Sequence, residues 1–226
     1  MKRRDFVSRT AAGGLWAGLG AAAWAQAPAT GAYVEGQHYV RLSQPVGVSA
    51  PAGKIEVVEF FWYGCPHCYA FEPTLEAWAK ALPADVALRR VHVGFRPNFR
   101  PMQQLYCTLE VMGLVESMQR KVFHAVQERA ERLDSAQAVI DFAARSGIDR
   151  AKFTEVFNSF GVQTKVQQGT RLAEAYKIDG VPALGIHGRY YTSPALAGGD
   201  RVPEAEGQRR SLAIADQLIA RVRKGG

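Results

Sequence analysis

The chain has 226 residues, of which 47% are hydrophobic and 22% are charged, so it has the composition of an ordinary globular protein with enough apolar side chains for a core. Its formal net charge is +7, but acidic and basic residues are interleaved instead of forming the dense basic stripe that binds nucleic acid, and we expect no nucleic-acid partner. This length predicts one large domain, or one domain that carries an insertion.

The first 25 residues predict a secretory signal peptide. A basic start at residues 2–4 is followed by an apolar stretch from Thr10 to Trp24, and the small residues that follow fit cleavage after Ala25. The apolar stretch is too short and too rich in Gly and Ala for a good membrane span. The arginine pair with Phe6 resembles a twin-arginine signal, and an ordinary Sec signal is the alternative. Either route leads to an oxidising compartment.

The mature chain begins with an Ala-, Gly- and Pro-rich stretch, after which strand patterns alternate with a helix. Residues 39–42 predict a short edge strand. Residues 54–63 are β-branched and aromatic without a breaker, which predicts a buried central strand. Residues 66–82 predict a helix with Pro66 at an allowed first-turn position, and residues 86–95 predict a second strand.

The pattern from Pro101 to about Ala175 is helical almost throughout. Ser135 and Asp149 are expected to cap two of these helices, and Gly161 is expected to separate the second of them from the next. Four apolar side chains are expected to share one face of that second helix: Phe153, Val156, Phe157 and Phe160.

Strand patterns return after the helical block. Residues 183–191 predict two short strands around a His187-Gly188 turn, and residues 206–223 predict an amphipathic helix. Strands therefore occur in two blocks with helices between them, which predicts an α/β domain interrupted by an all-helical domain. The α/β domain is expected at residues 26–97 and 169–226, and the helical insert at residues 98–168.

Two of the three cysteines form a Cys-x-x-Cys motif where the predicted central strand gives way to a helix. At that position Cys65 faces the helix start, whose unpaired N–H groups and dipole favour a thiolate, so its pKa is expected to lie below that of a free thiol. Pro66 leaves no N–H group unpaired there, and His67 can present a donor or a positive charge to the thiolate. Cys68 lies one turn later and is expected to be shielded. The pattern predicts a redox-active pair.

Other interpretations of the pair are weaker. A structural disulfide usually joins distant segments, whereas a disulfide within Cys-x-x-Cys closes a small ring and crosslinks no distant segments. A zinc site needs two further ligands at suitable spacing, and the other histidines are scattered. We therefore expect no metal and no cofactor. Cys107 is expected to be a buried apolar side chain, with a surface thiol as the alternative. Four aromatic residues are expected either in the core, Tyr69 and Phe71 first, or on a surface for unfolded chains: Trp62, Tyr63, Tyr69 and Phe71.

Two further features accompany the cysteines. Glu59 breaks the apolar strand six residues before Cys65. It is either an edge-facing or ion-paired carboxylate, or a buried one that moves protons to and from Cys68. The sequence Gly180-Val181-Pro182-Ala183 stands where the helical block ends and the next strand begins. In a thioredoxin-type site a cis proline at this place lies against the cysteine pair and leaves a backbone edge free for an extended peptide.

Six short stretches occur in an order that matches a known family: Glu59-Phe60-Phe61, Cys65-Pro66-His67-Cys68-Tyr69, Phe71-Glu72, His92-Val93, Asn158-Ser159-Phe160 and Gly180-Val181-Pro182-Ala183. Together they resemble the DsbA family of periplasmic thiol oxidases, and the resemblance covers roughly residues 33–220. It implies a thioredoxin fold with an inserted helical domain. It also implies a protein disulfide oxidoreductase that acts on reduced, exported polypeptides in the periplasm.

The resemblance implies a role for each residue of the site. Cys65 is the nucleophile that forms the mixed disulfide, and Cys68 is the buried partner that resolves it. His67 stabilises the Cys65 thiolate, and Pro182 is a cis proline preceded by Val181. A quinone-linked membrane partner of the DsbB type is expected to reoxidise the pair, and nothing requires more than a monomer. An isomerase or reductase, and a non-catalytic binding module with the same fold, are the alternatives.

Overall fold

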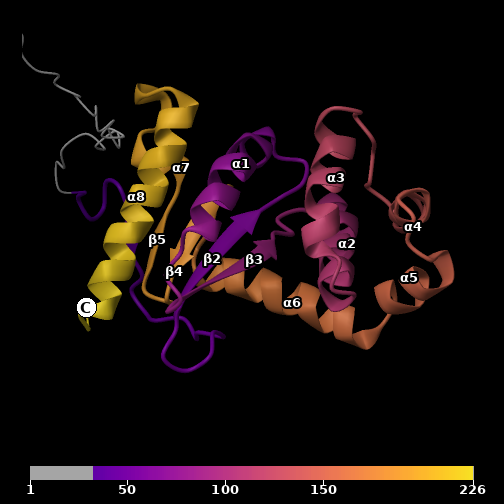
Figure 1. Ribbon diagram of the computed structural model, residues 1–226, viewed down its shortest axis with the longest axis horizontal. Coiled ribbons are helices and arrows are strands. Elements are labelled where there is room, and N and C mark those ends of the chain that lie inside the picture. The colour runs from indigo at the N-terminus through magenta and orange to yellow at the C-terminus, as the bar shows by residue number, and fades with distance from the viewer. Residues whose placement is uncertain (1–32, 226) are drawn as a thin grey trace, which may run out of the picture. The chain divides into compact units, whose positions relative to one another are not determined.

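A five-stranded sheet lies at the centre of residues 33–225, the part of the chain that this computed structural model describes (Figure 1). The predicted signal peptide and its cleavage site lie outside these residues. The strand order is β1-β5-β4-β2-β3, and β1 at the edge confirms the short strand predicted at residues 39–42. The strands are β1 (Val40–Arg41), β2 (Ile55–Phe61), β3 (Val86–His92), β4 (Ala183–Ile186) and β5 (Tyr190–Thr192).

The central strand is β2, as the apolar run at residues 54–63 predicts, and all seven of its residues are buried. It pairs in parallel with β3, where Phe61 is opposite His92, and antiparallel with β4, where Phe60 is opposite Ala183. Parallel neighbours need a crossover connection, and α1 supplies it between β2 and β3. The strand that delivers the cysteines is therefore held on both sides.

Helices flank the sheet and form the insertion. The helices α2 to α6 all lie between β3 and β4 in the chain, so the predicted α/β fold with a helical insertion is confirmed. The borders at residues 98 and 168 stay predictions, because α6 continues through residue 168. The helices are α1 (Pro66–Lys80), η1 (Pro97–Phe99), α2 (Arg100–Val111), α3 (Val115–Gln127), α4 (Ala136–Arg145), α5 (Arg150–Phe157), α6 (Phe160–Ala175), α7 (Pro194–Ala197), η2 (Gly199–Arg201) and α8 (Glu204–Arg223).

The two faces of the sheet are covered by different helices, because successive side chains of a strand point to opposite faces. On one face Val57 of β2 packs in a core cluster with Phe71 of α1 and Leu218 of α8. On the other face Phe60 packs against Tyr176, which follows α6, with ring centroids 5.2 Å apart. The sheet is thus the middle layer, with α1 and α8 on one side and the end of α6 on the other.

The core of the insertion is continuous with the end of β2. The ring of Phe123 in α3 lies 5.9 Å from that of Phe61 and 5.0 Å from that of Tyr63, measured between centroids. Tyr106 of α2 also contacts Phe61, with centroids 5.2 Å apart. The helical insertion therefore packs directly on the segment that leads to the cysteines.

Polar caps start the helices of the insertion. Ser135 begins α4 and accepts a hydrogen bond from the Ala138 N–H, and Asp149 begins α5 and accepts one from the Lys152 N–H. Both predicted caps are confirmed. Ser159 caps α6 in the same way, a helix start that the sequence analysis did not assign.

Two expectations about the end of α5 are wrong. Phe160 is 86% exposed and does not share the apolar face of α5. The reason is that Ser159 starts a new helix, of which Phe160 is the first residue, so the apolar periodicity does not continue across it. Gly161 consequently lies inside α6 and does not separate two helices.

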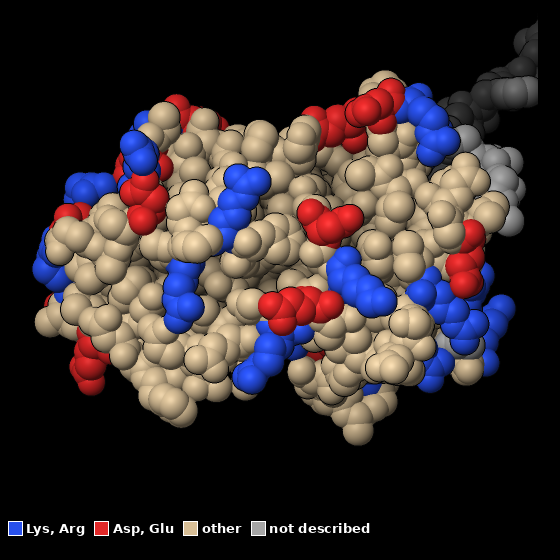
Figure 2. All heavy atoms as spheres, turned by 180° about the vertical axis from the view of Figure 1, so that it is seen from behind, with Lys and Arg blue, Asp and Glu red and all other residues tan. Residues whose placement is uncertain are grey.

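Charged side chains of both signs are mixed on the surface. Figure 2 shows this for the face opposite that of Figure 1. Among the helices of residues 33–225, none is both long enough and apolar enough to cross a membrane.

Candidate active site

The cysteine pair lies where β2 ends and α1 begins. Cys65 is the N-cap of α1 with an extended backbone, and Pro66 occupies the first helical position, as predicted. Both sulfurs carry free thiols. Cys65 retains 7% exposure, whereas Cys68, one turn later, is fully buried in the core cluster that it shares with the insertion. Both cysteines are thus buried, but only Cys65 keeps a small exposed area.

The two thiols have opposite pKa shifts. The pKa of Cys65 is lowered from 9.0 to about 6, chiefly by a hydrogen bond from the Cys68 side chain, which outweighs the opposing effect of burial. The backbone N–H groups of Cys68 and His67 and the charge of His67 lower it further. Burial, followed by the hydrogen bond to Cys65, raises the pKa of Cys68 well above its usual value. At neutral pH one sulfur is a thiolate and the other keeps its proton.

His67 has a side-chain partner that the sequence does not reveal. Its imidazole Nδ1 donates to Glu204 Oε1 at 2.8 Å, and 67% of the His67 side chain is exposed. This hydrogen bond raises the pKa of His67 and so favours its charged form. Glu204 is the first residue of α8, 137 residues further along the chain, and no spacing or periodicity in the sequence connects the two.

The Gly-Val-Pro segment lies against Cys65. The Val181–Pro182 peptide bond is cis, as predicted, and Cys65 Sγ lies 3.4 Å from the Val181 carbonyl oxygen, to which it donates when it is protonated. A groove of about 580 Å³ lies beside this contact. Its lining includes His67, Val181, Pro182, Pro194, Leu196 and Glu204.

A buried group of charges includes Glu59. The Glu59 side chain is fully buried, and its Oε2 lies 3.4 Å from Arg90 Nε. Arg90 Nη1 in turn donates to Glu72 Oε1 at 2.6 Å. Burial raises the pKa of Glu59 from 4.5 to about 8, although Arg90 opposes this and Glu72 adds to it. Glu59 is therefore both buried and beside a cation, so features of both sequence interpretations are present. Arg90 and Glu72 were not expected from the sequence to accompany it.

A neutral histidine fixes the segment before the cysteines. His92 is buried, and burial lowers its pKa to about 3. Its Nδ1 donates to the Val93 carbonyl at 3.0 Å, while its Nε2 accepts from the Tyr63 N–H at 3.2 Å. The Tyr63 hydroxyl donates to Gln119 Oε1 of α3 at 2.7 Å. The insertion and β3 thus hold the last residues before Cys65 in place.

The remaining candidates divide between core and surface. Tyr63 and Phe71 are fully buried, whereas Tyr69 is half-buried and its hydroxyl donates to Glu128, so the expectation that Tyr69 belongs to the core is wrong. Cys107 is 6% exposed, and burial raises its pKa to about 12, which confirms the buried interpretation.

Comparisons with known proteins agree with this geometry. The model of the DSBA-like thioredoxin domain family matches residues 56–208. The thiol:disulfide interchange protein DsbA of Bordetella parapertussis is 47% identical over 88% of this chain and 90% of its own length. The protein of the same name from Pseudomonas aeruginosa PAO1 is 42% identical over 84% and 86%. The crystal structure of Pseudomonas aeruginosa DsbA is 40% identical, with a TM-score of 0.78, over 85% of this chain and 96% of that chain.

Proposed function

The chain belongs to the DsbA family of thiol:disulfide interchange proteins, and we propose that Cys65 is the sulfur through which it oxidises its clients. It is a protein disulfide oxidoreductase of the DsbA type with a thioredoxin fold. The observation that carries the proposed role of Cys65 is the contrast between the two thiols. Cys65, which keeps 7% exposure, has a pKa lowered to about 6, and the fully buried Cys68 has a raised pKa.

The proposed reaction starts from the oxidised pair. A client thiolate attacks Cys65 Sγ, the Cys65–Cys68 bond breaks, and the electron pair of that bond goes to Cys68. A second client thiolate then attacks the client sulfur of the mixed disulfide. The client leaves with a disulfide, and Cys65 leaves as a thiolate, for which its low pKa makes it a good leaving group. Two electrons pass to the cysteine pair, Cys68 takes up one proton, and the other goes to solvent.

Two neighbours of the pair support the first step. Glu59, with a pKa of about 8, holds a proton at neutral pH, and when it ionises its charge raises the pKa of Cys68. We assign it the transfer of that proton to Cys68. His67 is assigned the stabilisation of the Cys65 thiolate, through its charge and its backbone N–H. Pro66 supports the helix start without adding an unpaired N–H.

The proposed client surface lies on the Val181 side of the pair. The 580 Å³ groove includes Val181 and Pro182 and reaches His67, so an extended chain joined to Cys65 would lie along it. The same groove is the proposed contact for a quinone-linked membrane partner of the DsbB type that reoxidises the pair. The proposed location is the periplasm, for which the predicted signal peptide is the support, and the proposed active form is a monomer.

Oxidation of a peptide that contains two cysteines tests this function. The oxidised protein should convert the peptide to its disulfide, measured as the loss of free thiols. Cys65→Ser should abolish the reaction. Cys107→Ala is the matched control and should retain the wild-type rate, because Cys107 is buried in α2 and takes no part in the proposed steps. A Cys65→Ser protein as fast as the wild type would contradict the proposal.

A further inference from the structure

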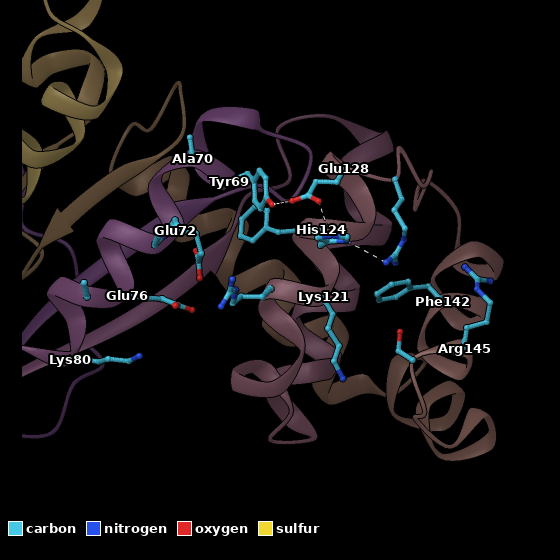
Figure 3. A pocket seen from close by; sticks show the side chains of 16 residues that line it. Tyr69, Ala70, Glu72, Glu76, Lys80, Lys121, His124, Glu128, Phe142 and Arg145 are labelled. Carbon is cyan, nitrogen blue, oxygen red and sulfur yellow. Dashed lines mark hydrogen bonds and ion pairs between the residues drawn. The ribbon is translucent and has the colours of Figure 1, made fainter.

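A second groove, of about 1060 Å³, runs along the other side of α1 and has no part in the proposed steps (Figure 3). One wall is α1, and the opposite wall is α3, with α4 and the residues after it at the far end. The α1 wall includes side chains at helical spacing, Tyr69, Pro73, Glu76 and Lys80, together with Glu72, whose carboxylate is paired with Arg90. The opposite wall includes Arg120, Lys121, Phe123, His124 and Phe142.

The groove has an apolar base between polar rims. Phe123 and Phe142 form this base, but both are almost completely buried, so they offer a ligand little apolar surface. Tyr69 and Pro73 add apolar surface from α1. Such a surface suits a chain that presents some apolar side chains together with polar ones.

The charges around the groove are not balanced. Glu128 pairs with His124, with 2.6 Å between Oε2 and Nε2. Three cations at the rim have no ion-pair partner within residues 33–225: Lys80, Arg120 and Lys121. One carboxylate of the groove, Glu76, is also unpaired there. Figure 3 shows Lys80 on the α1 side and Lys121 on the α3 side, so the unpaired positive charges stand on both rims. This excess is complementary to a negatively charged ligand.

The groove starts one helical turn from the reactive cysteine. Tyr69, its first α1 residue, donates its backbone N–H to the Cys65 carbonyl at 3.1 Å. From Tyr69 to Lys80 a helix rises about 16 Å, which about five residues of an extended chain would span. A polypeptide joined to Cys65 can therefore place a neighbouring segment here, on the side of α1 away from the Val181 groove.

We propose that this groove binds an extended acidic segment of the client polypeptide that is joined to Cys65. The inference rests on the proposed function and adds a substrate class to it: clients with acidic and apolar residues near the reacting cysteine react fastest. The contact is electrostatic at the rims and apolar at the base, so it guides clients without requiring one sequence.

The test compares peptides that share a two-cysteine core and differ only in a five-residue tail. One tail alternates Glu with Phe, one alternates Gln with Phe, and one alternates Lys with Phe, and each is attached at either end of the core. We expect the Glu tail to be oxidised about fivefold faster than the Gln tail at low salt, because three exposed charge pairs each contribute a small amount. The advantage should shrink at about 0.5 M salt.

Matched variants locate the effect. Lys80→Gln, Arg120→Gln and Lys121→Gln together should bring the rate for the Glu tail down to that for the Gln tail. The control removes the same charge from residues that are exposed, without an ion-pair partner in residues 33–225, and outside the groove: Lys54→Gln, Lys152→Gln and Arg171→Gln. It should keep the advantage. Far-ultraviolet circular dichroism of both triple variants checks that they fold.

The outcomes separate this inference from the function on which it rests. Equal rates for the Glu and Gln tails, or a faster Lys tail, would overturn the inference alone. Equal loss of the advantage in the control variant would also overturn it, because net charge would then explain the effect. If no peptide is oxidised, the proposed function fails and the inference fails with it.

Discussion

At the scale of single residues, the two cysteines of the site differ in the pKa of their thiols. Cys65 and Cys68 are three residues apart, yet one has a pKa near 6 and the other a pKa well above 9. The difference follows from the hydrogen bond that Cys68 donates to Cys65 and from the complete burial of Cys68, whereas Cys65 keeps a small exposed area. When the disulfide of such a pair is reduced by a client, Cys65 leaves as a thiolate and Cys68 must receive a proton.

A titration of the reduced protein tests whether Cys65 is a thiolate at neutral pH. We expect the ultraviolet absorbance of the thiolate to appear with a midpoint near pH 6, and Cys65→Ser to remove that step. Because folding lowers this pKa from 9.0, the thiolate stabilises the folded reduced protein fully above about pH 9, and this contribution is lost as pH falls through 6. A single step near pH 9 would contradict the assignment.

A substitution of Glu59 tests whether this residue supplies the proton to Cys68. Glu59→Gln should slow client oxidation at neutral pH by at least about tenfold, because the Cys68 thiolate loses its proton donor. In the wild type this assistance is lost as pH rises through about 8, so the rates of the two proteins should converge above it. The fold should be intact, since Arg90 keeps its hydrogen bond to Glu72. Equal rates for both proteins at pH 7 would exclude the proton-transfer role.

At the scale of elements, short-range signals predicted most of the structure. The caps at Ser135 and Asp149 lie within three residues of the N–H groups they accept from, so the sequence contains the whole interaction. Phe160 was misplaced because hydrophobic periodicity alone does not show that Ser159 starts a new helix. Tyr69 was misplaced because its partner, Glu128, lies in the insertion, and this contact depends on how two separate segments pack.

The cap at Ser135 gives a prediction for one element. Ser135→Ala should lower the free energy of unfolding by about 1 kcal/mol, because the Ala138 N–H at the start of α4 loses its acceptor. Ser117→Ala is the control: this exposed serine lies in the first turn of α3 and donates to the Leu114 carbonyl, so it caps no N–H group. Urea denaturation measures both. Equal effects would show that the cap does not stabilise α4.

At the scale of the whole molecule, contacts between distant segments complete the site. The motif around Cys65 predicted the fold and the place of the reactive pair. The pairing of His67 with Glu204 spans 137 residues, and the sequence offers no signal for it. The same is true of Arg90, which meets Glu59 only because β3 pairs in register beside β2. The burial and the side-chain partners of the site residues could therefore be seen only in the folded structure. The chemistry of the Cys-x-x-Cys motif could be predicted from the sequence.

The packing of the insertion on β2 predicts that the described domain unfolds as one unit. Phe123→Ala should destabilise the protein by about 3–5 kcal/mol, because Phe123 is fully buried and contacts both Phe61 and Tyr63. Phe160→Ala makes the same chemical change at an 86% exposed position and should cost less than about 0.5 kcal/mol.

Two signals recorded during denaturation separate the parts of the molecule. Within residues 33–225 the tryptophans are at positions 62 and 78, and Trp62 stacks on Phe99 with ring centroids 3.7 Å apart. A Trp62→Phe background leaves Trp78, which donates to Asp216 of α8, as the tryptophan signal outside the insertion, whereas far-ultraviolet circular dichroism reports mainly on helices. The two transitions should coincide in this background and should shift together when Phe123→Ala is added to it, because one continuous core cluster joins β2 to the insertion. If the helical signal in Phe123→Ala were lost at a lower denaturant concentration than the tryptophan signal, the insertion would unfold independently, and the surroundings of Cys68 would then not depend on it.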